Sequence, residues 1–139
     1  MERMNKVKRL AIDSMILIYL LEANENFSKP IRRQLEQAEE LILSSLGLGE
    51  ILAGFEKKAD TEGKLKFLSF IESYKKLSVV GFGKQEALIF AKLRAAYPSI
   101  KPPDAIHLAT AISGRADAFF THDKKLQKVE EVFILALER

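Results

Sequence analysis

Short apolar runs alternate along the chain with longer segments whose apolar residues recur every three or four positions. The short runs cover residues 8–12, 41–44, 77–82, 118–121 and 132–137, and they predict buried strands. The longer segments cover residues 14–22, 28–40, 45–58, 61–74, 84–97 and 102–114, and they predict helices. Residues 124–128 predict one further helical turn. Strands and helical segments therefore alternate along the whole sequence.

This alternation predicts the fold class. No Asn-Gly pair or similar hairpin signal joins consecutive strands, so neighbouring strands are not expected to be antiparallel. We expect an α/β fold, a three-layer α/β/α sandwich with a mainly parallel central sheet of about five strands. Right-handed crossovers would place helices on both faces of that sheet. With 139 residues, no internal repeat and no linker, residues 1–139 are expected to form a single domain.

Polar residues and prolines suggest where several helices begin. Ser28 is predicted to be the N-cap of its helix, with Pro30 in the first turn, and Thr61 is predicted to cap the helix that follows it. Pro102 and Pro103 fit the first turn of the last long helix, where a missing N–H costs nothing. That helix is apolar nearly all round, so we expect it to be enclosed.

Four acidic residues are expected to meet where the parallel strands end. Asp13 follows the first predicted strand, and Asp123 lies two residues after the fourth. Glu50 lies in the helix after the second strand, and Asp104 lies at the start of the helix that leads into the fourth. In an open parallel sheet, sites form at the carboxyl ends of the strands. The sequence therefore predicts that all four carboxylates face one crevice.

Each acid also has a purely structural explanation. Asp13 and Asp123 can cap the helical segments that follow them, Glu50 can be an exposed helix residue, and Asp104 gains from the helix dipole by about 0.3–1 kcal/mol. The four together are harder to explain in this way, because like charges a few ångströms apart repel unless a cation neutralises them. Asp117 lies at the opposite edge of the sheet and is assigned to turn chemistry.

The composition narrows the kind of site. The chain has no cysteine, which excludes disulfides, zinc thiolates and a cysteine nucleophile, and its two histidines cannot form a histidine-rich metal site. Oxygen ligands favour Mg²⁺ or Mn²⁺. Such an ion can activate water and neutralise the charge on a phosphate under in-line attack. The formal net charge of +3 permits nucleic-acid binding but does not argue strongly for it.

The N-terminal part resembles a signal peptide only superficially. Basic residues precede an apolar run at residues 15–21, but Asp13 interrupts the apolar region and no small-residue cleavage site follows. The run is also too short to span a bilayer. We expect a cytoplasmic protein without membrane association.

Four segments carry a resemblance to a known family. They are residues 11–14, 44–52, 103–109 and 120–126, and the last two together are the most specific. With them the chain resembles the PIN-domain family of metal-dependent ribonucleases, and within it the small VapC-type toxins. The resemblance extends over nearly the whole chain. It implies that Asp13, Glu50, Asp104 and Asp123 are the catalytic acidic quartet and the ligands of Mg²⁺ or Mn²⁺, with Glu50 either a ligand or the group that orients water.

The resemblance also concerns the neighbours of the acids. It implies that Ser14 and Thr121 are polar residues that support the quartet. Met15 departs from the family, since many members carry Asn or Ser there, and His122 stands where Asn is common. His122 is expected to be a surface histidine without a role, the alternative being a slight pH sensitivity of the site. His107 either touches the site or packs in the core with its polar tip satisfied.

The function implied by these residues is that of a metal-dependent endoribonuclease that cleaves single-stranded RNA, as the toxin of a VapBC-type toxin–antitoxin pair. One alternative is a catalytically inactive PIN-like module that binds RNA or protein. Another is a receiver-type phosphotransfer domain, which also gathers aspartates around Mg²⁺ but needs a Lys after its last strand. Residues 133–137 are followed by no such Lys.

Partners are predicted from charge and from apolar residues. Lys57, Lys58, Lys124 and Lys125 are candidates for RNA contacts, because an acidic site needs a positive rim to admit a polyanion. The helices at residues 28–40 and 61–74 carry more large apolar residues than one face of a small sheet covers. We therefore expect a homodimer and a small antitoxin as a possible further partner.

Overall fold

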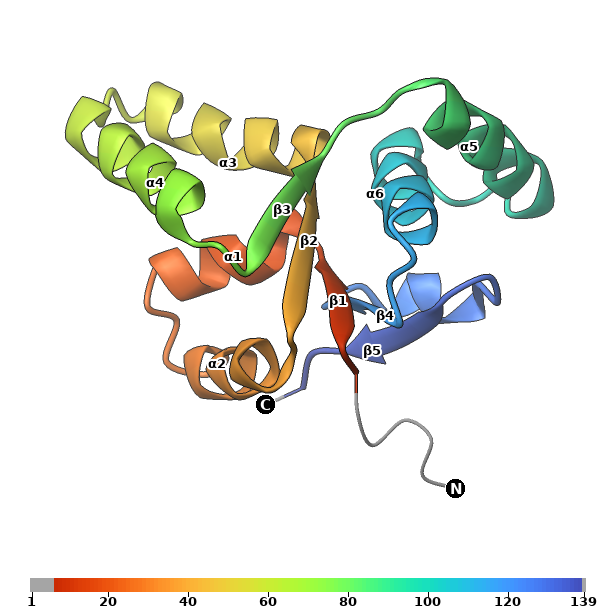
Figure 1. Ribbon diagram of the computed structural model, residues 1–139, viewed down its shortest axis with the longest axis horizontal. Helices are drawn as coiled ribbons and strands as arrows, with labels where there is room; N and C mark the ends of the chain where they lie inside the picture. Colours follow the sequence, from red (N-terminus) through yellow and green to blue (C-terminus); the bar gives the residue numbers. More distant parts are fainter. Residues whose placement is uncertain (1–6, 139) are drawn as a thin grey trace.

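The computed structural model describes residues 7–138 of the chain. Within these residues, five strands, six α-helices and one 3₁₀ helix follow one another in the order that the sequence predicts (Figure 1). The elements are β1 (Arg9–Ile12), α1 (Ser14–Leu21), α2 (Ser28–Gln37), β2 (Glu40–Ser44), α3 (Ser45–Lys57), α4 (Thr61–Ser73), β3 (Leu77–Val80), α5 (Lys84–Ala96), α6 (Pro102–Ser113), β4 (Ala118–Thr121), η2 (Lys124–Lys128) and β5 (Phe133–Ala136).

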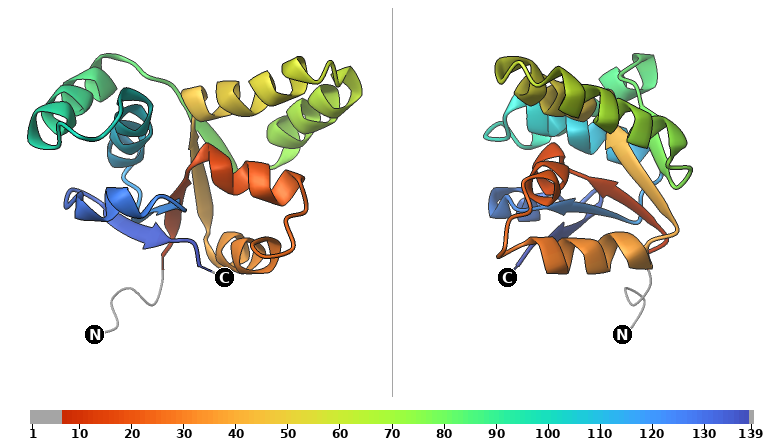
Figure 2. Two further views of the ribbon diagram at one scale, coloured as in Figure 1. Left: turned by 180° about the vertical axis from the view of Figure 1, so that it is seen from behind. Right: turned by 90° about the vertical axis from the view of Figure 1, so that its left-hand side faces the viewer.

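All strand pairs in the sheet are parallel. The strand order is β3-β2-β1-β4-β5, with β1 in the centre. Helices α1 to α4 lie on one side of the sheet and α5 and α6 on the other (Figures 1 and 2). This is the predicted three-layer α/β/α sandwich.

Two apolar cores lie on the two faces of the sheet. Alternate residues of each strand point to opposite faces, so Leu10 and Ile12 of β1 join the core under α1 to α4, whereas Ala11 joins the core under α5 and α6. The same alternation places Phe120 in the first core and Phe119 in the second. With both faces covered, the strands need nearly continuous apolar sequence, and this is why they appear as short apolar runs.

The register of the central strands decides which residues meet at the carboxyl edge. Ile12 of β1 pairs with Leu43 of β2 and with Phe120 of β4. The next residue of each strand is polar, namely Asp13, Ser44 and Thr121. At the opposite edge, the Asp117 carboxylate accepts the backbone N–H groups of Lys8 and Arg9 at 3.0 and 2.8 Å, in keeping with its predicted structural role.

Two predicted helix caps are wrong. Ser28 is the first residue of α2 and Phe27 occupies the N-cap position. Here the Asn24 side chain accepts the N–H groups of Asn26 and Phe27, and this turn sets the start of the helix instead. Likewise Asp60, not Thr61, caps α4 through a 2.9 Å hydrogen bond from the Gly63 N–H.

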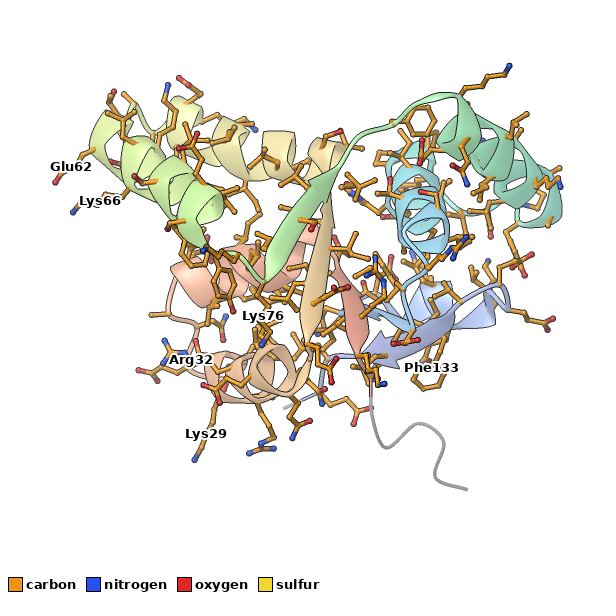
Figure 3. All side chains as sticks on the ribbon, viewed as in Figure 1. Lys29, Arg32, Glu62, Lys66, Lys76 and Phe133 are labelled. Carbon is orange, nitrogen blue, oxygen red and sulfur yellow. The ribbon has the colours of Figure 1, made fainter. Side chains whose placement is uncertain are left out.

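Several predicted boundaries also shift. Helix α2 ends at Gln37 rather than residue 40, because the N–H groups of Glu39 and Glu40 already bond to the Lys8 carbonyl and start β2. The Lys76 ammonium, labelled in Figure 3, bonds to the Leu35 carbonyl at 2.6 Å near that helix end. Strand β3 ends two residues before the predicted residue 82. Among residues 7–138 no helix has the length and apolar character needed to cross a bilayer.

Candidate active site

The four predicted acids line one pocket at the carboxyl edge of the sheet. Its volume is about 530 Å³, and Asp13, Glu50, Asp104 and Asp123 come to it from four different parts of the chain. Ser14 and His107 line the same pocket. The convergence that the sequence predicts is therefore present in the fold.

Asp13 is held between the ends of β1 and β4. Its side chain is 8% exposed, and its Oδ2 accepts a 2.9 Å hydrogen bond from the Thr121 hydroxyl. Its Oδ1 lies 3.5 Å from both the Ser14 hydroxyl and the Met15 N–H, so it also caps α1 through a long contact. Asp13 is thus both a weak cap and a member of the pocket, and the two readings of the sequence do not exclude each other.

Thr121 joins two of the acids. While its hydroxyl donates to Asp13, the same oxygen accepts the backbone N–H of Asp123 at 3.1 Å. The Asp123 carboxylate in turn accepts the Lys125 N–H at 2.9 Å and caps η2. Thr121 is fully buried, so this polar link is shielded from water.

Glu50 is held by two donors. The Ser14 hydroxyl donates to its Oε1 at 2.6 Å, and Nε2 of His107 lies 3.1 Å from the same oxygen. The Glu50 side chain is 36% exposed while that of His107 is 3% exposed, so the imidazole reaches the carboxylate from inside the protein. Both interpretations of His107 hold, because it is a buried histidine with satisfied nitrogens and it also touches the site.

A hydrogen-bond chain behind His107 fixes its ring. The Ser44 hydroxyl accepts the Gly47 N–H at 2.9 Å and lies 2.7 Å from Nδ1 of His107. The Ser44 hydroxyl can then donate its proton to Nδ1. The proton of the neutral imidazole is therefore on Nε2, which donates it to Glu50. A Cβ on Gly47 would lie 2.9 Å from Leu43 Cδ1 and 3.3 Å from the Ser44 hydroxyl, so glycine permits this close approach of α3.

Asp104 lies in the first turn of α6, and its charge is affected by the other three acids. Burial, followed by the negative charges of Asp13 and Asp123, raises the pKa of the Asp104 carboxyl above its ordinary value. Glu50 acts in the same direction, and the positive charge of His107 in its protonated form acts in the opposite one. A bound cation would relieve this repulsion.

The donor chemistry fits a hard divalent cation, although the acids do not form a complete cage by themselves. Within residues 7–138 no group of three or more His, Cys, Asp or Glu side chains is arranged so that it could hold a metal ion. Oxygen atoms of Asp13 and Glu50 are engaged by hydroxyl donors instead. Mg²⁺ usually keeps several waters and needs only one or two protein carboxylates, so the set present is compatible with it.

The opposite wall of the pocket is apolar and aromatic. Met15, Ile18 and Tyr19, three and four positions apart on α1, form it. The Tyr19 hydroxyl lies 3.0 Å from Nδ1 of His122, whose ring centre is 4.8 Å from that of Phe27. His122 is therefore not a free surface residue, because it packs against Tyr19 and Phe27 and lines the pocket. The spacing of Met15, Ile18 and Tyr19 along the sequence could have indicated this wall, whereas no sequence pattern indicated the contact of Tyr19 with His122.

The predicted lysines are distributed around the pocket. Lys57 lines it, and Lys58 lines a smaller neighbouring pocket beyond Ile18. Lys125 lines another pocket, which shares Asp104 and Asp123 with the acidic one. Lys124 lines none of these three pockets.

The family follows from comparison with known proteins. The model of the PIN domain family matches residues 10–132, so the chain belongs to the PIN-domain family. This assignment removes the receiver-type alternative. No curated protein matches the sequence significantly.

Solved structures with a similar fold come from toxin–antitoxin complexes. A chain of VapBC2 from Rickettsia felis, solved bound to a DNA fragment from its promoter, is 16% identical with a TM-score of 0.75, over 94% of this chain and 99% of that chain. A chain of VapBC-1 from nontypeable Haemophilus influenzae is 20% identical with a TM-score of 0.73, over 92% and 97%. A chain of a toxin–antitoxin complex from Klebsiella pneumoniae is 24% identical with a TM-score of 0.70, over 88% and 94%. At these identities the likeness concerns the fold.

Proposed function

We propose that this protein is a Mg²⁺- or Mn²⁺-dependent endoribonuclease that cleaves single-stranded RNA. The observation that carries the proposal is the pocket in which Asp13, Glu50, Asp104 and Asp123 meet. Burial and the charges of Asp13 and Asp123 raise the pKa of Asp104, as expected where acids gather without a cation to neutralise them. Membership of the PIN-domain family supports the same activity.

The residues of the chain would act by positioning the carboxylates, the cation and the RNA phosphate. Thr121 and Ser14 orient the carboxylates of Asp13 and Glu50, and of the four acids one or two would bind the cation directly and the others through its waters. The bound cation would supply neutralisation of the phosphate charge and activation of water. Lys57, at the pocket, would bind RNA phosphate.

We also propose that the protein is the toxin of a VapBC-type pair. The solved complexes named above support this, and so does an apolar groove of about 590 Å³ between α1, α2 and α4. Leu21 is 50% exposed at this groove and Phe70 is 44% exposed. Arg32 and Lys66, labelled in Figure 3 on α2 and α4, line the groove too. A small antitoxin is the partner that would cover this surface.

Cleavage of a labelled single-stranded RNA tests the activity. We expect the full chain to cleave it with Mg²⁺ or Mn²⁺ and to lose this activity in excess chelator. Asp104→Asn and Asp123→Asn are each expected to lose at least about 100-fold in rate, because metal assistance is worth several kcal/mol.

The matched control is Asp117→Asn, the same change at the opposite edge of the sheet. It is expected to cleave at close to the wild-type rate. Wild-type rates in both site variants, or cleavage that survives chelation, would show that the quartet is only structural. RNA binding without any cleavage would support the inactive-module alternative.

A further inference from the structure

A second pocket continues the acidic pocket on the side of α6 and η2. It has a volume of about 430 Å³, and Asp104 and Asp123 line both pockets. The two pockets are therefore adjacent, with these two acids between them. We call this second pocket the lysine pocket, after Lys101, Lys125 and Lys128, which line it.

The lysine pocket has a rigid base. Ile100, at 4% exposure, and Leu126, at 1%, are buried in the core and lie between the lysines. Two segments form its walls, the loop before α6 and the 3₁₀ helix η2. The Lys128 ammonium bonds to the Ser99 hydroxyl and connects the two walls. The backbone of Lys125 is held by its N–H bond to Asp123.

Within the described residues, no lysine of the lysine pocket forms an ion pair. In the part of the chain that the structure describes, the side chains of Lys101 and Lys125 have no ion pair or hydrogen bond, and all three lysines are exposed. Three ammonium groups without an ion pair thus lie beside the acidic pocket, around the two acids that both pockets share. Such a surface suits a chain of phosphates that continues beyond the acids.

We propose that Lys101, Lys125 and Lys128 form a phosphate subsite that holds the RNA backbone on one side of the bond to be cleaved. The proposal rests on the proposed ribonuclease function. Acidic residues at the site of cleavage repel a polyanion, so the phosphates that flank the cleaved one must supply the binding free energy. Lys57 lines the acidic pocket by α3, and the lysine pocket lies past Asp104 and Asp123. In this arrangement the RNA runs from Lys57, past Asp104 and Asp123, to the lysine pocket.

Binding of RNA in chelator tests the subsite without cleavage. The probe is a fluorescent single-stranded oligonucleotide, titrated at several salt concentrations. Each lysine–phosphate contact contributes about 0.7 to the slope of log affinity against log salt for a single strand. The triple variant Lys101→Gln, Lys125→Gln, Lys128→Gln is therefore expected to lose about 2 from the magnitude of that slope. Lys92→Gln on α5, an exposed lysine away from these pockets, is expected to keep the wild-type slope.

Cleavage of shortened substrates tests the one-sided geometry. We expect the triple variant to raise KM for a long substrate by at least tenfold and to leave kcat within about threefold, because the lysines bind but do not react. Nucleotides are then removed from the 5′ end or from the 3′ end of the substrate. Removal from one end is expected to abolish the difference between wild type and triple variant, whereas removal from the other end leaves it.

The outcomes separate this proposal from the proposed function. An unchanged salt slope in the triple variant, or a difference that neither truncation removes, overturns the subsite alone. Binding without cleavage by the wild type overturns the nuclease proposal, and the salt slope still decides the subsite. No binding of RNA by the wild type overturns both. A circular dichroism spectrum matching that of the wild type shows that the triple variant is folded.

Discussion

Replacing Ser44 by alanine is expected to weaken the protein through two buried hydrogen bonds at once. The Ser44 hydroxyl caps α3 by accepting the Gly47 N–H, and it donates to Nδ1 of His107. Both residues are 4% exposed, so water does not replace the missing partner. The methyl group of alanine fits the space, so the change removes the polar contacts and little else.

The magnitude follows from these two contacts. Loss of an N-cap costs about 0.5–2 kcal/mol. A buried nitrogen without a partner costs about 1–3 kcal/mol. The two losses share one oxygen atom and do not simply add, so we expect about 2–3 kcal/mol in the free energy of unfolding. For a chain of this size that corresponds to a Tm lower by about 6–12 °C.

Urea unfolding followed by circular dichroism measures this change, with Ser45→Ala as the control. Ser45 is the next residue and is exposed, so its replacement is expected to stay within about 0.5 kcal/mol of wild type. Ser44→Ala is also expected to lower kcat, because an imidazole without its anchor no longer fixes the Glu50 carboxylate. Equal stability of the two variants would refute the hydrogen-bond chain and the assigned tautomer of His107.

Three further predictions concern charge, backbone and surface. Because the pKa of Asp104 is raised above its ordinary 3.8 in the folded state, protonation favours the fold and stability falls as the pH rises through that window. In chelator Asp104→Asn should therefore be more stable than wild type to urea at neutral pH, with no advantage below pH 3.8. Ala59 has a φ of 53°, so Ala59→Gly should raise the free energy of unfolding by about 0.5–1 kcal/mol, whereas Ala91→Gly within α5 should lower it by a similar amount. Leu65 on α4 is 58% exposed, and we expect light scattering at micromolar concentration to show a homodimer; the mass of one chain, 15.7 kDa, would contradict this prediction.

The topology could be predicted from the sequence because the sheet is parallel and covered on both faces. Such strands must be apolar almost throughout, so residues 118–121 were recognisable as a strand with the boundaries that the structure has. Once strands and helices alternate, the carboxyl ends of the strands share one edge. The positions of Asp13 and Asp123 at that edge follow without any knowledge of side-chain contacts.

The hydrogen bonds of the site could not be predicted, since they join residues far apart in the sequence. His107 and Glu50 are 57 positions apart and no local pattern connects them. The predicted helix caps were wrong for the opposite reason, because the candidate capping residues are neighbours in the sequence. Asp60 and Thr61 are both good caps, and the backbone conformation decides that Asp60 is the one. Sequence patterns report burial and periodicity, and both of these questions depend on exact geometry.

The place of β1 at the centre of the sheet has a consequence for the order of synthesis. Among the strands of residues 7–138, β1 is made first, yet one of its edges stays unpaired until β4 exists, and the Asp13–Thr121 bond joins positions 108 residues apart. Translation at about 5–20 residues per second separates Asp13 from Asp123 by about 5–22 s. During this interval the acids belong to a growing chain and not to a pocket. For a nuclease of the proposed kind, the ribosome and the messenger that produce it are thus exposed to a complete site only after Asp123 has been synthesised.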